Sequence, residues 1–422
     1  MVFQSFAQAQ SVLLWTTFGL AVLMGAMVNK TNFCTMGAVS DWVNMGDMGR
    51  MRAWLLAIAV AMLGVVFLEA RGLITADASF PPYRANQLIW AENLLGGLMF
   101  GVGMTLASGC GNKALIRIGG GNIKSVMVLL IIAVISYFML NPFPGSDKTL
   151  FSVLFFSWIR PLAVTLSTHQ DLGAVIAGAD KAISARLVIG GILGTALLIA
   201  IFKSADFRKN FDNIFGGLVV GIAVVALWYV SSNITVSADG QTFSLQSFVA
   251  EQWDMYAKPE DLKPADSRPL STQSFSFINP MGQAFGYVTG GLQRGALTIG
   301  IMSLAGVILG SLLWSLLSRS FRFEWFASFK DFANHFIGAI LMGFGGVLAL
   351  GCTIGQGVTG VSTLAIGSFI TFGAIVLGCA LTMKIQYYKM VYEDEATFSK
   401  ALITGLVDLK LLPSSLRKLE AV

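Results

Sequence analysis

The sequence predicts an all-α membrane protein with about nine transmembrane helices and several short broken or re-entrant half-helices, since a helix needs about 20 apolar residues to cross a bilayer. Of the 422 residues, 55% are hydrophobic and 12% are charged, and the mean hydropathy is +0.72. Uncharged runs of about 18 or more residues, long enough to span the hydrocarbon, lie at 1–29, 93–112, 125–146, 213–238, 295–318 and 332–383. A repeated Gly-Cys segment adds a third observation, which indicates two related halves.

The Gly-Cys segment is a glycine-rich apolar stretch that ends once at Cys110 and once at Cys352. A shift of 242 positions brings seven residues of the first copy onto identical residues of the second, namely Gly96 onto Gly338, Gly101 onto Gly343, Gly103 onto Gly345, Leu106 onto Leu348, Ala107 onto Ala349, Gly109 onto Gly351 and Cys110 onto Cys352. Glycine-interrupted apolar segments at matching places in two halves are typical of a transporter's substrate site near the membrane midplane. We therefore expect two pseudo-symmetric halves that are inverted relative to each other.

The chain divides into three parts, which are a first membrane repeat (1–212), a second membrane repeat (213–384) that contains a polar loop (232–285), and a C-terminal tail (385–422). Lysine and arginine in short loops mark the cytoplasmic side of a membrane protein. This rule places the basic loops 203–212 and 318–331 inside and the acidic loop 232–285 outside. The side on which the N-terminus lies is left open.

Nine segments are predicted to cross the membrane, in chain order 10–28, 53–70, 93–110, 125–140, 187–202, 214–231, 295–317, 335–352 and 363–383. The apolar N-terminus lacks the basic region and cleavage site of a signal peptide, so we expect a retained helix there. Residues 149–166 are apolar but interrupted by Arg160-Pro161, which favours a tilted or interfacial helix. A break is expected at 355–360, where glycine recurs.

The stretch around Cys34 is predicted to start a new short helix. The first helix should stop at 29–32, and Thr31 or Asn32 can serve as the N-cap, which would place Cys34 in the first turn. An ordinary loop with a buried cysteine is the alternative, because free cysteine is often buried.

Thiols at the ends of broken helices indicate a site for a soft anion. Broken helices persist in a membrane only where they line a cavity or are buried in protein, and a helix N-terminus favours an anion. A cysteine S–H is a weak donor and a polarisable acceptor, which suits a sulfur or selenium atom better than the hard oxygens of sulfate. Such a site binds weakly, as passage requires.

The cysteine and histidine content argues against a zinc site or a disulfide scaffold, because the chain has four cysteines without a CxxC pair and only two histidines. No metal or cofactor is expected. The net charge of +5 fits basic cytoplasmic loops and gives no support to nucleic-acid binding. Cys379 lies inside an apolar helix with no polar or glycine-rich surroundings, and we interpret it as a small buried side chain.

Three motifs resemble those of the YeeE/YedE family of bacterial inner-membrane proteins: Asn32-Phe33-Cys34-Thr35-Met36-Gly37, Ser108-Gly109-Cys110-Gly111, and the stretch 341–357 with Gly351-Cys352-Thr353-Ile354-Gly355-Gln356-Gly357. Gly306-Val307-Ile308-Leu309-Gly310-Ser311, which runs into 319–322, is similar too. The resemblance covers roughly residues 12–384. It implies crossing helices and half-helices in two related halves, and uptake of thiosulfate, which passes between three cysteines along a central path. It also implies a small cytosolic sulfur-carrier protein with a single reactive cysteine as a partner.

On this resemblance, the predicted pathway residues are Cys34, Cys110 and Cys352 together with Asn32, Gly109, Gly111, Gly351, Thr353, Gly355 and Gln356. The chain departs from some thiosulfate-type members at Asn112-Lys113, where they have small neutral residues, and it has a long outer loop at 232–270. Because the family includes members tied to selenium, a selenium compound remains an alternative substrate.

A membrane-embedded sulfurtransferase or disulfide exchanger is the alternative from another class. Such an enzyme needs an activated thiolate and usually a resolving cysteine, whereas Lys113 is the only candidate activator and no CxxC is present. Ordinary helix packing explains the glycines but not why both copies end in cysteine. We therefore expect a non-enzymatic transporter that passes its anion non-covalently.

Overall fold

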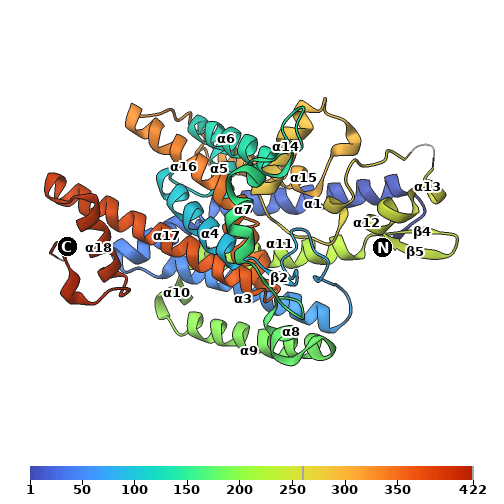
Figure 1. Cartoon of the computed structure of the whole chain (residues 1–422), viewed down its shortest axis with the longest axis horizontal. Coiled ribbons are helices and arrows are strands. Elements are labelled where there is room, and N and C mark those ends of the chain that lie inside the picture. The colour runs from blue at the N-terminus through green and yellow to red at the C-terminus, as the bar shows by residue number, and fades with distance from the viewer. Residues whose placement is uncertain (259–260, 421–422) are drawn as a thin grey trace.

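The computed structural model describes residues 1–258 and 261–420, and its long helices run roughly along the long axis of the molecule (Figure 1). Within these ranges, nine helical segments are long and apolar enough to cross a membrane, which confirms the predicted fold class. Their long helices are α1 (Phe6–Lys30), α3 (Gly49–Ala70), α4 (Trp90–Leu106), α6 (Ile123–Leu140), α9 (Ala182–Phe202), α11 (Phe211–Asn233), α15 (Ile299–Leu317), α16 (Phe329–Leu348) and α17 (Ile366–Val391).

Short helices alternate with the long ones. Those that matter for the site are α2 (Thr35–Ser40), which continues into a π-helical turn (Asp41–Met45), α5 (Gly111–Gly119), α14 (Ile278–Thr289), and a helix at 353–362 that contains a π-helical turn (Gly355–Gly360). The others are α7 (Ser157–Ile159), α8 (Leu172–Ala177), α10 (Ala205–Lys209), α12 (Leu245–Ser247), α13 (Trp253–Tyr256) and α18 (Phe398–Asp408). The strands are β1 (Val2–Phe3), β2 (Gln87–Leu88), β3 (Val164–Thr165), β4 (Thr235–Ala238) and β5 (Gln241–Ser244).

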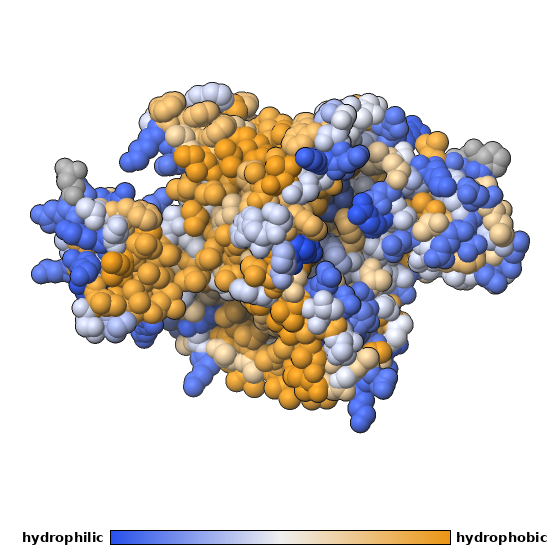
Figure 2. All heavy atoms as spheres, in the orientation of Figure 1, coloured by the Kyte–Doolittle hydropathy of each residue, from blue (hydrophilic) through white to orange (hydrophobic). Residues whose placement is uncertain are grey.

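The N-terminus and the C-terminus lie at opposite ends of the molecule. The N-terminal amino group donates a hydrogen bond to the Asn233 carbonyl at 2.5 Å. Strand β1 pairs with β4, which pairs with β5. The N-terminus therefore lies at the same end as the acidic segment 232–285, which we call the acidic end, and the C-terminus lies at the opposite, basic end (Figure 1). In Figure 2, hydrophobic residues gather over a broad middle band and hydrophilic ones over both ends, as a bilayer requires.

Helices α4 and α16 carry the two copies of the Gly-Cys segment and pack with their backbones in close contact. A Cβ at Gly96 would lie 2.7 Å from the Gly345 carbonyl oxygen, and one at Gly103 would lie 2.6 Å from the Gly338 carbonyl oxygen. Only glycine permits this approach, as in other membrane helix pairs. The shift of 242 positions exchanges these two contacts, because it matches Gly96 with Gly338 and Gly103 with Gly345. Since the contacts occur in opposite order along the two helices, the helices run antiparallel. This pair supports the predicted inverted halves, which remain a prediction for the whole chain.

The break in the second Gly-Cys segment is not at Gly355–Gly360, as predicted, but at 349–352. Gly355–Gly360 is helical, and its glycines make room for neighbours: a Cβ at Gly355 would lie 2.5 Å from the Ser276 hydroxyl, and one at Gly357 would lie 2.5 Å from the Phe372 ring. The glycines thus serve close packing instead of ending the helix.

Two other segments refine the predictions from sequence. Residues 152–162 form a short apolar helix with most side chains exposed, where a tilted or interfacial helix was predicted. The end of the predicted outer loop 232–285 is not an exposed loop, because α14 begins at Ile278 and the irregular residues 273–277 before it are all buried. Hydrogen bonds hold this segment in the interior: the Ser274 hydroxyl donates to the Val224 carbonyl and the Thr359 hydroxyl to the Phe275 carbonyl.

Candidate functional site

Each of the three predicted site cysteines stands directly before a short helix: Cys34 before α2, Cys110 before α5, and Cys352 before the helix at 353–362. The Cys34 sulfur accepts a hydrogen bond from the Gly37 N–H at 3.5 Å, and the Cys352 sulfur accepts one from the Gly355 N–H at 3.4 Å. These are the bonds that an N-cap side chain makes. All three thiols are buried and free of disulfides.

A residue with left-handed backbone precedes each cysteine by two positions. The φ angles are 50° at Asn32, 57° at Ser108 and 57° at Leu350, a conformation uncommon outside glycine. It reverses the chain between the long helix and the short one that follows. The prediction of Thr31 or Asn32 as N-cap is therefore wrong: Asn32 forms the turn, and Cys34, with extended backbone (φ −152°, ψ 126°), is the cap.

Thr353 brings two of the three helix starts together. It directly follows Cys352, and its hydroxyl donates a hydrogen bond to the Cys110 sulfur at 3.3 Å. The residue next to Cys352 thus contacts the Cys110 thiol directly. In the described part of the chain, no hydrogen bond joins Cys34 to either of them.

The predicted glycines lie in tight packing around these thiols. A Cβ added at Gly109 would lie 3.1 Å from the Lys113 side chain. One at Gly111 would lie 3.2 Å from the Ile278 side chain, and one at Gly351 would lie 3.3 Å from the Gln356 side chain. The Gln356 amide donates to the Ala349 carbonyl at 2.5 Å and ties the short helix to the end of α16. Asn32, by contrast, is exposed.

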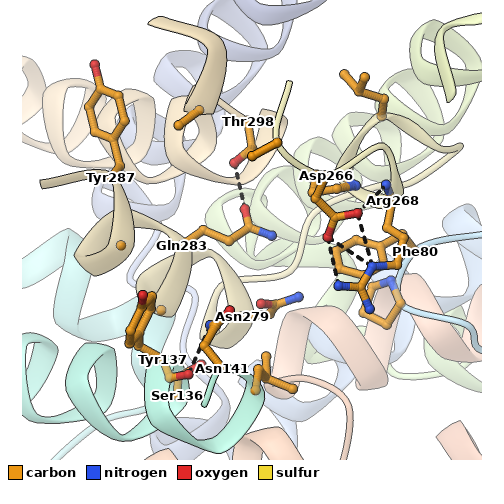
Figure 3. Close-up of a pocket in the computed structure, with 18 of the residues that line it drawn as sticks. Phe80, Ser136, Tyr137, Asn141, Asp266, Arg268, Asn279, Gln283, Tyr287 and Thr298 are labelled. Atoms are coloured by element: carbon orange, nitrogen blue, oxygen red, sulfur yellow. Dashed lines mark hydrogen bonds and ion pairs between the residues drawn. The ribbon is translucent and has the colours of Figure 1, made fainter. Parts of the chain in front are cut away.

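A cavity of about 390 Å³ extends from the acidic end to the break before Cys352. Its inner end is formed by Leu350 and Gly351, and its mouth by residues 264–270 and 295–298. Figure 3 shows polar side chains lining it, among them Asn141, Asn279, Gln283 and Thr298. The Thr298 hydroxyl donates to the Gln283 side-chain oxygen at 2.6 Å.

The charged pair at the mouth of this cavity is Arg268 and Asp266, with 2.8 Å between Nη2 and Oδ2. Partial burial disfavours the charged form of Asp266, but hydrogen bonds from Arg268 and its positive charge outweigh burial and hold the pKa of Asp266 below its usual range. Both groups are charged at neutral pH, so the pair adds no net charge to the mouth.

Cations lie near Cys34 and Cys110. The Arg50 side chain pairs with Asp41 (Nη2 to Oδ1, 2.5 Å) and lies over α2, where a Cβ at Gly37 would be 2.3 Å from its Nη1. Lys113 lies within electrostatic range of both thiols. These charges can attract an anion, and Lys113 is placed to activate the Cys110 thiol.

Two polar residues beside Cys352, Tyr83 and Ser276, were not predicted from the sequence. They lie far apart in the chain, and neither belongs to a recognisable motif. Their hydroxyls are buried next to each other, and neither makes a hydrogen bond of normal geometry among the described residues, which is unusual for buried polar groups.

Cys379 is fully buried in α17, as predicted, but its surroundings are not wholly apolar. The Thr105 hydroxyl lies 3.2 Å from its sulfur, and Gly101 packs on its backbone. No pattern in the sequence indicates this contact, because α4 and α17 meet only in the fold.

Replacing Cys379 by alanine is expected to leave thiosulfate uptake within about twofold of wild type at equal protein level, since the change removes one small buried group at a cost of about 1 kcal/mol. Uptake by proteoliposomes and the melting temperature in detergent measure the two effects. A loss of uptake as large as that from the other cysteines would place Cys379 in the pathway.

The fold and the site together define a multi-pass membrane protein in which buried thiols stand at the starts of short helices. The chain belongs to the sulphur transport family, whose profile matches residues 30–381, and this confirms the resemblance to YeeE/YedE proteins. The thiosulfate transporter TsuA of Escherichia coli is 24% identical over 365 residues, which cover 84% of this chain and 90% of that protein. The thiosulfate transporter TsuA of Spirochaeta thermophila is 22% identical over 373 residues, which cover 87% and 97%.

Proposed function

We propose that this protein takes up thiosulfate, or a closely related sulfur-containing anion, across the bacterial inner membrane, and that the anion passes non-covalently along Cys34, Cys110 and Cys352. The observation that carries the proposal is the hydrogen bond from Thr353 to the Cys110 sulfur. It joins the starts of two short helices that follow cysteines, and the second of these cysteines comes directly after Gly351 in the cavity wall. The curated relatives, both thiosulfate transporters, support the choice of substrate.

The chemistry of the helix starts suits this anion. Thiosulfate carries a soft terminal sulfur and a hard sulfonate group. A thiol offers a weak donor and a polarisable sulfur to the soft end, while the N–H groups of the short helices offer positive potential to the charge. Neither interaction is strong, so the anion can move from one site to the next, as conduction requires.

The charges at the two ends indicate how the protein is oriented in the membrane. We place the acidic end outside and the basic end, with the loops 203–212 and 318–331, in the cytoplasm. The cavity then opens outward and ends near Cys352, while Lys113 and Arg50 attract the anion toward the inner side. A small sulfur-carrier protein with one reactive cysteine is the proposed cytosolic acceptor.

A thiol sulfurtransferase is the second candidate, because Lys113 lies within electrostatic range of Cys110. That enzyme would transfer the terminal sulfur of thiosulfate to the thiolate, forming a persulfide and releasing sulfite. A permease would release thiosulfate unchanged.

Uptake of labelled thiosulfate into proteoliposomes tests the proposal, with protein-free liposomes as control and with sulfate and selenite as competitors. The expected result is saturable accumulation of intact thiosulfate that sulfate does not compete away. Equal competition by sulfate would contradict recognition of the soft sulfur, and release of sulfite would favour the sulfurtransferase. Stronger competition by selenite than by unlabelled thiosulfate would identify a selenium compound as the substrate.

A further inference from the structure

Two amide side chains of α14 line the cavity of about 390 Å³ at the acidic end, which we call the outer cavity. Asn279 and Gln283 are four residues apart and therefore lie on the same face of the helix. Both side chains are half-buried and form part of the cavity wall. The cavity is many times larger than the roughly 10–15 Å³ that one water molecule needs, so it has room for a small anion together with water.

The start of α15 fixes the orientation of the Gln283 amide. As the N-cap of α15, the Thr298 hydroxyl accepts from the Ile301 N–H at 3.2 Å and donates its own hydrogen to the Gln283 side-chain oxygen at 2.6 Å. A Cβ at Gly300 would lie 3.0 Å from the same oxygen. The amide nitrogen is turned away from Thr298 (Figure 3) and makes no hydrogen bond with the described residues, so its N–H groups are free to bind a ligand.

Asn279 carries a second free amide, in the first turn of α14. Its side chain lines the cavity without a hydrogen bond to any described residue. Helix α14 begins in the interior, where the Ile278 side chain would lie 3.2 Å from a Cβ at Gly111, and it ends at the exposed Thr289. The partial positive charge of a helix lies at its N-terminus, so α14 favours an anion most near Asn279.

The wall of the outer cavity provides no net charge among the described residues. Its charged side chains there are Asp266 and Arg268, which pair with each other at the mouth. An anion in the cavity would therefore be held by neutral N–H donors and by the helix dipole. Such donors bind an anion weakly enough for it to leave again, as passage requires.

We propose, resting on the proposed thiosulfate transport, that the outer cavity is a capture site in which the Asn279 and Gln283 amides donate hydrogen bonds to the sulfonate oxygens of the anion. The amides recognise oxygen atoms alone. Their contribution is therefore capture, while the preference for a soft sulfur comes from the thiols further along the path. Asn279 and Gln283 thus bind the anion before it reaches the cysteines.

Gln283→Glu and Asn279→Ala test the proposal separately in the full chain. Gln283→Glu keeps an oxygen for Thr298 but replaces the amide donor by a negative charge, and it is expected to raise the KM for thiosulfate about tenfold or more. Asn279→Ala removes the other donor and is expected to raise the KM about fivefold. The maximal rate should stay within about twofold of wild type, because only binding before the later steps is weakened. Uptake by proteoliposomes over a range of thiosulfate concentrations measures both values.

Gln293→Glu is the matched control. It makes the same substitution at the acidic end, at an exposed side chain outside the cavity wall, and its KM is expected to stay within about twofold of wild type. An unchanged KM in both test variants overturns the proposal, and so does a rise no larger than that of Gln293→Glu. If only one test variant folds, its KM decides. A loss of folded protein in both assigns the amides to packing and also overturns the proposal.

The melting temperature in detergent separates this inference from the proposed function, because a bound ligand stabilises the folded protein whether or not it is transported. Thiosulfate is expected to raise the melting temperature of wild type and to raise that of Gln283→Glu less. If this difference is found but wild type takes up no thiosulfate, the proposed function fails and the capture site stands. Normal uptake by wild type with an unchanged KM in both test variants rejects the inference alone.

Discussion

Replacing Cys110 or Cys352 by serine is expected to lower thiosulfate flux at least about tenfold, although serine is the stronger hydrogen-bond donor. The Cys352 sulfur accepts from the Gly355 N–H, and a serine oxygen caps a helix well, so the fold should survive the change. What serine lacks is the polarisable sulfur that the soft end of the anion requires. Alanine is expected to be at least as damaging as serine.

Uptake by proteoliposomes at equal protein level measures this effect, and Cys379→Ser is the matched control because its thiol lies outside the proposed path. Serine variants that retain wild-type flux would show that the site needs only a hydrogen bond and would refute recognition of a soft sulfur. A serine variant that fails to fold would instead show that the thiol is needed for packing.

Replacing Arg84 by glutamine is expected to lower the free energy of unfolding by about 3–5 kcal/mol, the usual cost of removing one partner of a buried ion pair. Arg84 is 0% exposed. Its guanidinium pairs with Glu69 at 2.5 and 2.9 Å and binds the Thr363 carbonyl at 2.7 Å. Glutamine would leave the buried Glu69 carboxylate with only the longer contact to Arg186, at 3.8 Å, and would free the end of the 353–362 helix.

The melting temperature in detergent measures this loss, with Arg268→Gln as control. Arg268 also pairs with a carboxylate, that of Asp266, but its side chain is 74% exposed, and pairs at the surface contribute at most about 1 kcal/mol. Equal melting temperatures for the two variants would show that the Arg84 contacts contribute little to stability.

The helices were the part of the fold that the sequence predicted best. Long uncharged runs leave few alternatives to a spanning helix, and the seven matched residues around Cys110 and Cys352 pointed to the segments that meet in the interior. Boundaries were less accurate: α3 was predicted to start at residue 53 but begins at Gly49, so that it includes the charged residues Arg50 and Arg52. Hydropathy does not report such ends.

The cysteines of the candidate site were predictable from sequence, whereas their surroundings were not. The left-handed turn at Leu350 carries no glycine or asparagine signal. Glycines at Gly355–Gly360 were interpreted as a break, although they serve packing against Ser276 and Phe372. Contacts such as Thr105 with Cys379 join residues far apart in the chain, and no local pattern marks them.

The rate at which a mild alkylating reagent labels the four cysteines, with and without thiosulfate, tests non-covalent passage along the thiols most directly. Mass spectrometry of the intact protein in proteoliposomes reports each site. Neutral buried thiols react slowly, and we expect slow labelling at neutral pH that thiosulfate slows further at Cys34, Cys110 and Cys352 but not at Cys379. Rapid labelling of Cys110 that is lost in Lys113→Met would indicate an activated thiolate and contradict the account, as would labelling that thiosulfate leaves unchanged at all three sites.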